Sequence, residues 1–231
     1  MEQAARRLTR LYLGLVLYGV SMAAIVTAHL GVMPGDVLHQ GLVASAAALG
    51  LRISLGQMTI LIGALVLLGW IPLRQRPGLG TVSNVLVIGV AVDGALRVLP
   101  VPSSLLLRVV LLLAGVGLNA LATALYIGAR LGPGPRDGLM TGIVARTGWP
   151  VRVVRTAIEV SVVAAGWLLG GNFGPGTLLY ALAIGPLVQP LLPRLQVAKS
   201  VTAQGVAAQG VSAHPGTGSA GRQVQEAEVE A

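Results

Sequence analysis

Several stretches of this chain run for twenty residues or more without a charged side chain. Two of them, residues 53–73 and 109–129, each hold 21 residues. A helix of that length spans the ~30 Å hydrocarbon core of a bilayer. Only 10% of the residues are charged and 54% are hydrophobic, and a soluble fold could not solvate its surface with so few charges. The sequence therefore predicts an integral membrane protein.

Other apolar stretches predict further spans. Residues 11–30 and 77–99 are long enough to cross, and the first is better explained as a span than as a signal peptide because similar segments follow it. Residues 160–193 contain no charge and are divided into two spans by the glycine-rich stretch 170–176. Strict two-residue alternation is absent, so these segments are expected to be helices rather than strands of a barrel. The expected fold class is an all-α membrane protein.

An internal duplication organises the sequence. Residues 30–38 match residues 131–139 at an offset of 101, and Gly41 then matches Gly142. Later matches join Arg52 to Arg152, residues 80–81 to 176–177, and residues 88–89 to 184–185. Each half contains one span, a Gly/Pro-rich turn with an aspartate, a short segment and two more spans. We expect repeat 1 to cover about residues 8–100 and repeat 2 about residues 104–194.

The two short segments decide the number of spans. Residues 36–50 and 137–150 are too short to cross comfortably. If both are re-entrant or half-helices, the chain has six transmembrane helices in two inverted repeats of three. Thirteen basic residues then lie on the cytoplasmic side and three on the opposite side. If both short segments cross, the chain has eight spans with a twelve-to-four division, so segment length, rather than charge, favours six.

Charge and composition give the expected location and partners. The formal net charge is +8, but the basic residues occur singly or in pairs between apolar runs, so the positive-inside bias explains them better than nucleic acid does. Arginine accounts for 15 of 16 basic residues, which favours a bacterial source. We expect a multi-pass protein of the bacterial inner (plasma) membrane with cytoplasmic termini. Residues 1–197 should form the membrane domain, and residues 198–231 a disordered tail.

The duplicated motif resembles a known family. The stretch Leu-Gly-Val-Met-Pro-Gly-Asp-Val-Leu-His-Gln-Gly at residues 30–41 and its mate Gly-Pro-Gly-Pro-Arg-Asp-Gly-Leu-Met at residues 132–140 are similar to the YczE/YyaS/YitT family of bacterial membrane proteins. The resemblance covers about residues 8–194 and is closer to the YczE branch. It implies an integral membrane protein whose biochemistry is poorly defined.

Asp36 and Asp137 are the first candidate binding residues. Each follows a proline by two residues and opens a short segment. One interpretation is helix N-capping by the carboxylate. The other places both aspartates at a shared substrate site between the repeats, as in transporters with inverted repeats, where they would suit a proton, a metal cation or an organic amine. His39 lies three residues after Asp36 on the same helix face and could exchange protons with it.

Glu159 is the fourth candidate binding residue, since acidic groups inside membranes are often functional. It lies four residues after Arg155, and Asp93 lies four before Arg97, so ion pairs within a helix are the alternative explanation for both acids. Other polar and small residues are expected to join helices. These are Gln57, Asn84 and Asn119, together with the pairs Gly166/Gly170 and Ala181/Gly185.

The leading functional hypothesis is a permease for a small solute, with coupling to protons as one form of it. The alternative is a non-transporting membrane partner that binds or stabilises another membrane protein or enzyme complex. We expect no enzymatic activity, because neither a nucleophile–base set nor the HExxH and Gly-x-Ser-x-Gly motifs occur. We expect no cofactor and no metal, since the chain has no cysteine and no other clear ligand set. The expected partners are the lipid bilayer and a small solute or proton, and not nucleic acid.

Overall fold

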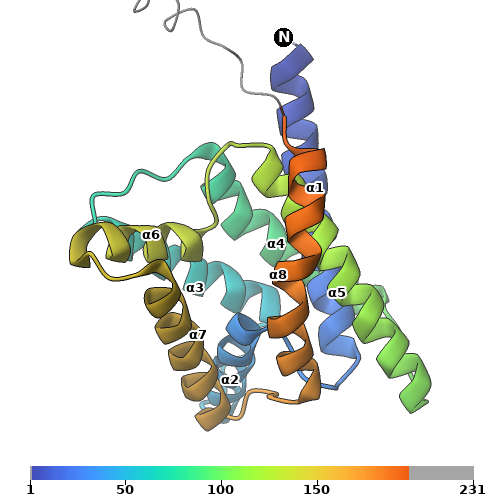
Figure 1. The fold of residues 1–231 in the computed structure, drawn as a ribbon. Helices are drawn as coiled ribbons and strands as arrows, with labels where there is room; N and C mark the ends of the chain where they lie inside the picture. Colours follow the sequence, from blue (N-terminus) through green and yellow to red (C-terminus); the bar gives the residue numbers. More distant parts are fainter. Residues whose placement is uncertain (1, 198–231) are drawn as a thin grey trace, which may run out of the picture. The chain divides into compact units, whose positions relative to one another are not determined.

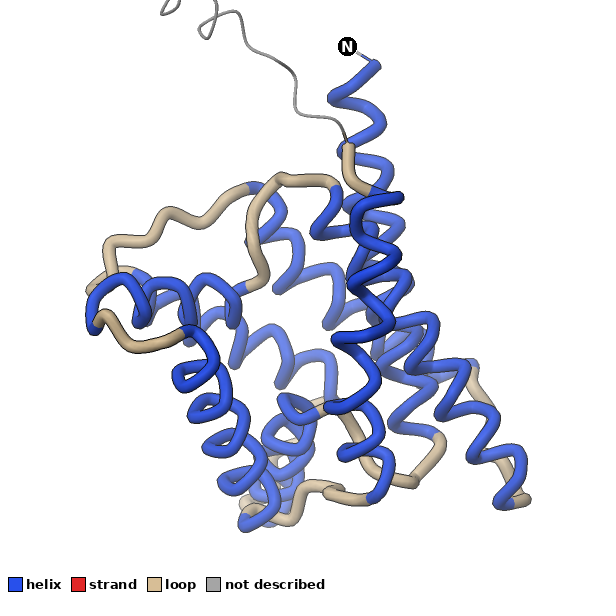
Figure 2. The backbone as a smooth tube through the Cα atoms, in the orientation of Figure 1, coloured by secondary structure: helices blue, strands red, loops and turns tan. Residues whose placement is uncertain are grey.

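Eight helices and no strand make up residues 2–197, the part of the chain that the computed structural model describes (Figures 1 and 2). The all-α prediction is therefore confirmed for these residues, whereas the predicted tail from residue 198 lies outside them. The helices are α1 (Glu2–Thr27), α2 (Pro34–Ala48), α3 (Leu55–Trp70), α4 (Leu79–Val98), α5 (Leu105–Gly128), α6 (Pro135–Thr147), α7 (Val151–Leu168) and α8 (Pro175–Leu195).

Four of the eight helices within residues 2–197 are long and apolar enough to cross a membrane. They are α1, α4, α5 and α8, with 26, 20, 24 and 21 residues. A straight helix of 20 residues is about 30 Å long, which matches the hydrocarbon core of a bilayer. Large apolar side chains on their outer faces are exposed, for example Leu106 at 73% and Leu182 at 78%. Such faces suit lipid rather than water.

The other two predicted spans differ from expectation. Helix α3 has 16 residues, because its N-cap is Ser54 and it ends at Trp70. The Ser54 hydroxyl accepts from the Gln57 backbone N–H, and the Gln57 side chain accepts from the Ser54 N–H, which together form a capping box. Helix α7 begins at Val151 instead of at the apolar run from residue 160, so it carries charged residues in its first half. Neither helix therefore counts as a typical span: α3 is short at 16 residues, and α7, with 18, carries three charged residues, Arg152, Arg155 and Glu159.

The short segments form short helices, as predicted. Helix α2 has 15 residues and α6 has 13, so each is about 20 Å long and cannot span the bilayer alone. Each has a proline at its first position, where the missing N–H is not needed. Asp36 and Asp137 are the third residues of these helices, and the N-cap residues are Met33 and Gly134. The N-capping interpretation is therefore wrong, because neither helix has a side-chain cap.

Helices α1 and α5, the first of each half, pack along one another in opposite directions. A Cβ atom at Gly14 would lie 2.8 Å from the Tyr126 backbone nitrogen, and one at Gly115 would lie 3.3 Å from that of Ile25. At the offset of 101, Gly14 corresponds to Gly115 and Ile25 corresponds to Tyr126. The two contacts are therefore the same contact with the two halves exchanged. Glycine at both positions lets the backbones approach closely. Around this seam lies the buried core, which includes Leu11, Leu15, Met22, Val92, Leu112 and Val116.

A second exchanged pair joins the turns to the helices that end each half. The Gly80 N–H donates to the Leu131 carbonyl at 2.9 Å, and the Gly176 N–H donates to the Leu30 carbonyl at 2.7 Å. The hydroxyls of Thr81 and Thr177, which are buried, bond the turns opposite them. The turn of each half is thus held by the last helix of the other half. This arrangement fixes where the two short helices begin.

Candidate functional site

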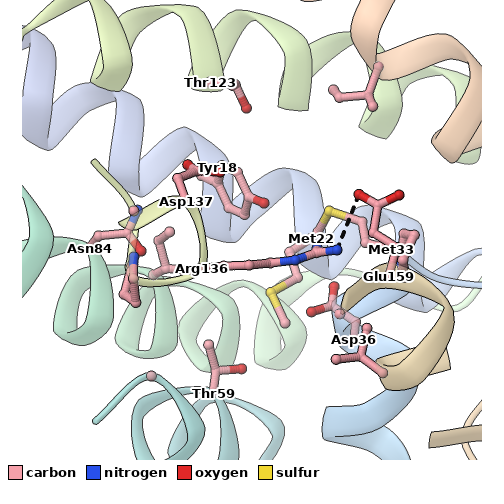
Figure 3. Close-up of a pocket in the computed structure, with 18 of the residues that line it drawn as sticks. Tyr18, Met22, Met33, Asp36, Thr59, Asn84, Thr123, Arg136, Asp137 and Glu159 are labelled. Carbon is pink, nitrogen blue, oxygen red and sulfur yellow. Dashed lines mark ion pairs between the residues drawn. The ribbon is translucent and has the colours of Figure 1, made fainter. Parts of the chain in front are cut away.

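A cavity of about 530 Å³ lies where the two halves meet (Figure 3). All eight helices contribute side chains to its wall. The four predicted site residues, Asp36, His39, Asp137 and Glu159, all line it. This volume is in the range of sites for small organic molecules. The structure therefore gathers residues that lie more than 100 positions apart in the sequence around one space.

Asp36 lies on the first turn of α2 and is only 5% exposed. One carboxylate oxygen, Oδ1, lies 3.1 Å from His39 Nδ1, so the predicted pair forms. The Thr59 hydroxyl of α3 lies 3.4 Å from the same His39 nitrogen. The second carboxylate oxygen, Oδ2, is buried and has no hydrogen-bond partner among the described residues. A buried oxygen of this kind favours a donor or a cation beside it.

Asp137 lies on the first turn of α6, at the other side of the cavity (Figure 3). The Tyr126 hydroxyl of α5 donates to Asp137 Oδ2 at a long 3.5 Å. A Cβ atom at Gly134 would lie only 3.2 Å from the same oxygen, so the turn leaves little room beside it. Asp137 is not equivalent to Asp36 in its contacts, because Met140 replaces His39 in the second half.

Glu159 of α7 is paired with two arginines. Its Oε1 atom lies 3.1 Å from Arg136 Nη2 and 3.4 Å from Arg155 Nε. The pair with Arg155 within α7 was predicted, whereas the pair with Arg136 was not. Arg136 reaches across the cavity from α6 to α7 (Figure 3). Its repeat mate is Gly35, so the duplicated motif already distinguished this position, although its side-chain direction depends on packing.

One predicted ion pair is wrong. Asp93 does not pair with Arg97 among the described residues, and its carboxylate instead accepts hydrogen bonds from the Ser54 hydroxyl and from the Gly56 N–H at 2.8 Å. Asp93 therefore fastens the start of α3 to α4. The reason is the close approach of these helices, since a Cβ atom at Gly56 would clash with the Gly89 carbonyl oxygen.

The two sides of the cavity differ in how tightly their helices pack. Helix α3 packs along α4, but no comparable packing joins α7 to α8. On α4, Val85 and Gly89 are buried against α3. Their equivalents on α8 are Ala181 and Gly185, which line the cavity, and a Cβ atom at Gly185 would have no neighbour within 4 Å. The expected helix packing through Ala181 and Gly185 is therefore absent here, and the cavity has one loosely closed side.

Of the three polar residues that were expected to join helices, Asn119 does so. Asn119 donates to the Ser21 hydroxyl at 2.8 Å and accepts from the Tyr180 hydroxyl at 2.7 Å, which connects α5 to α1 and α8. This confirms its predicted role, whereas Gln57 caps its own helix and Asn84 lines the cavity. Within residues 2–197, no group of three or more His, Cys, Asp or Glu side chains is arranged to hold a metal ion.

Comparison with known proteins places the chain in a family. Residues 5–192 match the model of a family of unknown function (DUF6198). This chain belongs to that family. It is 40% identical to an uncharacterized protein of Haemophilus influenzae over 179 residues, and this alignment covers 78% of this chain and 80% of that relative. It is 34% identical over 197 residues to the uncharacterized membrane protein YczE of Bacillus subtilis, covering 84% and 88%.

The membership confirms the predicted resemblance to YczE-like proteins. The membership also supports the membrane character of the chain, since the relative YczE is named a membrane protein. Four helices within residues 2–197 of this chain are long and apolar enough to cross a bilayer. No solved structure matches this chain. The cavity and its charges therefore carry the functional argument.

Proposed function

We propose that this DUF6198 protein is a permease for a small solute in the bacterial inner membrane, with the solute bound in the central cavity. The observation that carries the proposal is the cavity itself, to which all eight helices and all four predicted site residues contribute. Charged groups buried among membrane helices are energetically costly and are usually associated with function. A purely structural membrane protein has no need for three carboxylates around one space.

The proposed architecture is six spans in two inverted repeats. Helices α1, α3 and α4 form the first triplet, and α5, α7 and α8 form the second, with α2 and α6 re-entrant. Support comes from the antiparallel contact of α1 with α5 and from the exchanged bonds of Gly80 and Gly176. Inverted-repeat transporters bind solutes between their halves and open alternately to each side. Tight packing of α3 on α4 and loose packing of α7 and α8 would be one of two such states.

A labelling experiment tests this topology. The natural chain has no cysteine, so single cysteines can be introduced at Gln75, between α3 and α4, and at Asn172, between α7 and α8. An impermeant thiol reagent should label position 75 only from the cytoplasm and position 172 only from outside. Labelling of position 75 from outside would exclude the model with six spans and cytoplasmic termini, and it would favour the model with eight spans.

Uptake by liposomes that contain the purified chain tests the function. We expect saturable uptake of at least one member of a panel of labelled amines, amino acids and organic acids, above that of empty liposomes. Coupling to protons would appear as uptake that depends on a pH gradient. No uptake of any member, together with co-purification of one membrane protein in fixed ratio, would contradict transport and support the alternative role of a membrane partner.

A further inference from the structure

The charges around the cavity do not balance. The wall holds three carboxylates, Asp36, Asp137 and Glu159, but only two arginines, Arg136 and Arg155. Both arginines lie against Glu159. Asp36 has no ion pair with arginine or lysine among the described residues, and its neighbour within pairing distance is His39. Counting the carboxylates and arginines of the wall alone, the site has one formal negative charge in excess.

Asp36 also has an unused acceptor. Its side chain is buried, it lines the cavity, and Oδ2 lacks a hydrogen-bond partner within residues 2–197. Leaving a buried carboxylate oxygen unpaired is unfavourable unless a donor is supplied from outside the protein. A ligand that brings a positive charge and N–H donors would satisfy both the charge and the free oxygen.

The remaining wall favours an organic rather than a bare cation. A cavity of about 530 Å³ is far larger than the ~30 Å³ that one water molecule occupies in the liquid. No cluster that could hold a metal ion is present among the described residues. Apolar side chains make much of the wall around the charged groups. They include Met22, Met33, Ile62, Val66, Ile88 and Ile184.

A carboxylate on the ligand fits less well. Arg136 and Arg155 lie within ion-pair distance of Glu159, at 3.1 and 3.4 Å, although Arg136 Nη2 makes no hydrogen bond in good geometry within residues 2–197. An anionic or zwitterionic ligand would have to compete with Glu159 for these arginines. An ammonium group without a carboxylate leaves both ion pairs in place and needs only local movement of the wall around Asp36 Oδ2, which is buried.

We propose that the cavity binds organic ammonium ions with an apolar body, with the ammonium group on Asp36 and the body against the apolar wall. The proposal rests on the proposed function in that it names the solute class of the same cavity. The ammonium group would donate hydrogen bonds to Oδ2 of Asp36, and His39 would retain Oδ1.

The test measures binding of chosen probes to the purified full chain in detergent. Phenethylammonium should bind at least tenfold more tightly than 2-phenylethanol, its neutral analogue, since the alcohol can donate only one hydrogen bond to Asp36 and brings no positive charge to it. In a series of n-alkylammonium ions, affinity should rise about threefold to fourfold for each methylene that the wall buries. Equal affinity for the amine and the alcohol would overturn the proposal without any variant.

Variants then locate the ammonium site. Asp36→Asn keeps the shape and removes the charge, and it should weaken phenethylammonium binding at least tenfold. Glu2→Gln, a change at an exposed acid of α1 outside the cavity wall, should leave binding unchanged. Unaltered binding in a folded Asp36→Asn variant would contradict the assignment of Asp36.

Two further outcomes separate this inference from the proposed function. Tighter binding of phenylalanine or 3-phenylpropionate than of phenethylammonium would refute the solute class, while a permease with another solute would stand. Asp36-dependent binding of phenethylammonium without uptake by liposomes would support the ligand class and refute transport.

Discussion

Gly166→Ala is expected to destabilise the protein by roughly 1–3 kcal/mol, in the range of overpacked cores. A Cβ atom at Gly166 would lie 2.3 Å from the Leu38 backbone nitrogen and 2.4 Å from the Val37 carbonyl carbon. These are backbone atoms of α2, so they cannot turn aside as a flexible side chain would. A Cβ atom at Gly41 would likewise lie 2.4 Å from the Gly166 oxygen, so α2 and α7 touch backbone to backbone.

The change should lower the melting temperature in detergent by several degrees, given about 2–4 °C per kcal/mol for a chain of this size. Gly117→Ala is the matched control, because Gly117 also lies within a helix and a Cβ atom there would have no neighbour within 4 Å. Alanine favours a helix over glycine by up to ~1 kcal/mol, so this control should be neutral or stabilising. Equal melting temperatures for the two variants would show that α2 and α7 are not in close contact.

The duplicated motif allowed much of the site to be predicted from the sequence. Proline with aspartate two residues later occurs twice at an offset of 101, and both aspartates lie in the first turn of short helices that line one cavity. His39 pairs with Asp36 because residues three apart share a helix face. These features follow from local spacing, which a sequence shows directly.

Features that depend on packing between helices were not predicted. No partner was predicted for Arg136, but from the first turn of α6 its long side chain reaches Glu159 of α7. Asp93 was assigned to Arg97 on its own helix, yet it bonds to Ser54 and Gly56 of α3. In both cases the partner lies more than 20 positions away in the sequence, and no periodicity within one helix indicates that partner.

Small residues gave a mixed result for the same reason. Gly166 does bring two helices together, but Gly170 lies beyond the end of α7 with φ of 87°, where glycine relieves strain rather than packs. Ala181 and Gly185 have the same spacing as a packing motif and yet line the cavity. A small-residue pattern indicates that a close approach is possible, and the state of the molecule decides whether it is made.

Locking α3 to α4 is expected to abolish transport. A Cβ atom at Gly63 would lie 3.5 Å from Val85 Cβ, which is within the range for a disulfide. Cysteines at positions 63 and 85 should therefore oxidise readily in membranes. If the two sides of the cavity open in turn, this disulfide holds the state seen here. Solute uptake should then fall to the level of empty liposomes and return after reduction.

The equivalent positions in the second half are Val160 of α7 and Ala181 of α8. Gly69 of α3 approaches Leu139, and Gly166 of α7 approaches Leu38, which is the repeat equivalent of Leu139. Gly69 therefore corresponds to Gly166, and Gly63 to Val160. The match of Val85 with Ala181 follows from the offset of 96 between α4 and α8. Val160 is 61% exposed, and Ala181 is exposed as well. These two positions should meet only when α7 closes onto α8.

Disulfide formation between cysteines at 160 and 181 therefore tests the central claim most directly. The readout is the loss of free thiols to a maleimide reagent under mild oxidation, with the 63/85 pair as the positive control. The proposed permease requires the 160/181 disulfide to form in a fraction of molecules that grows with time. Alternation between the two sides would be contradicted if the 63/85 variant oxidises completely while the 160/181 variant stays reduced and still takes up solute.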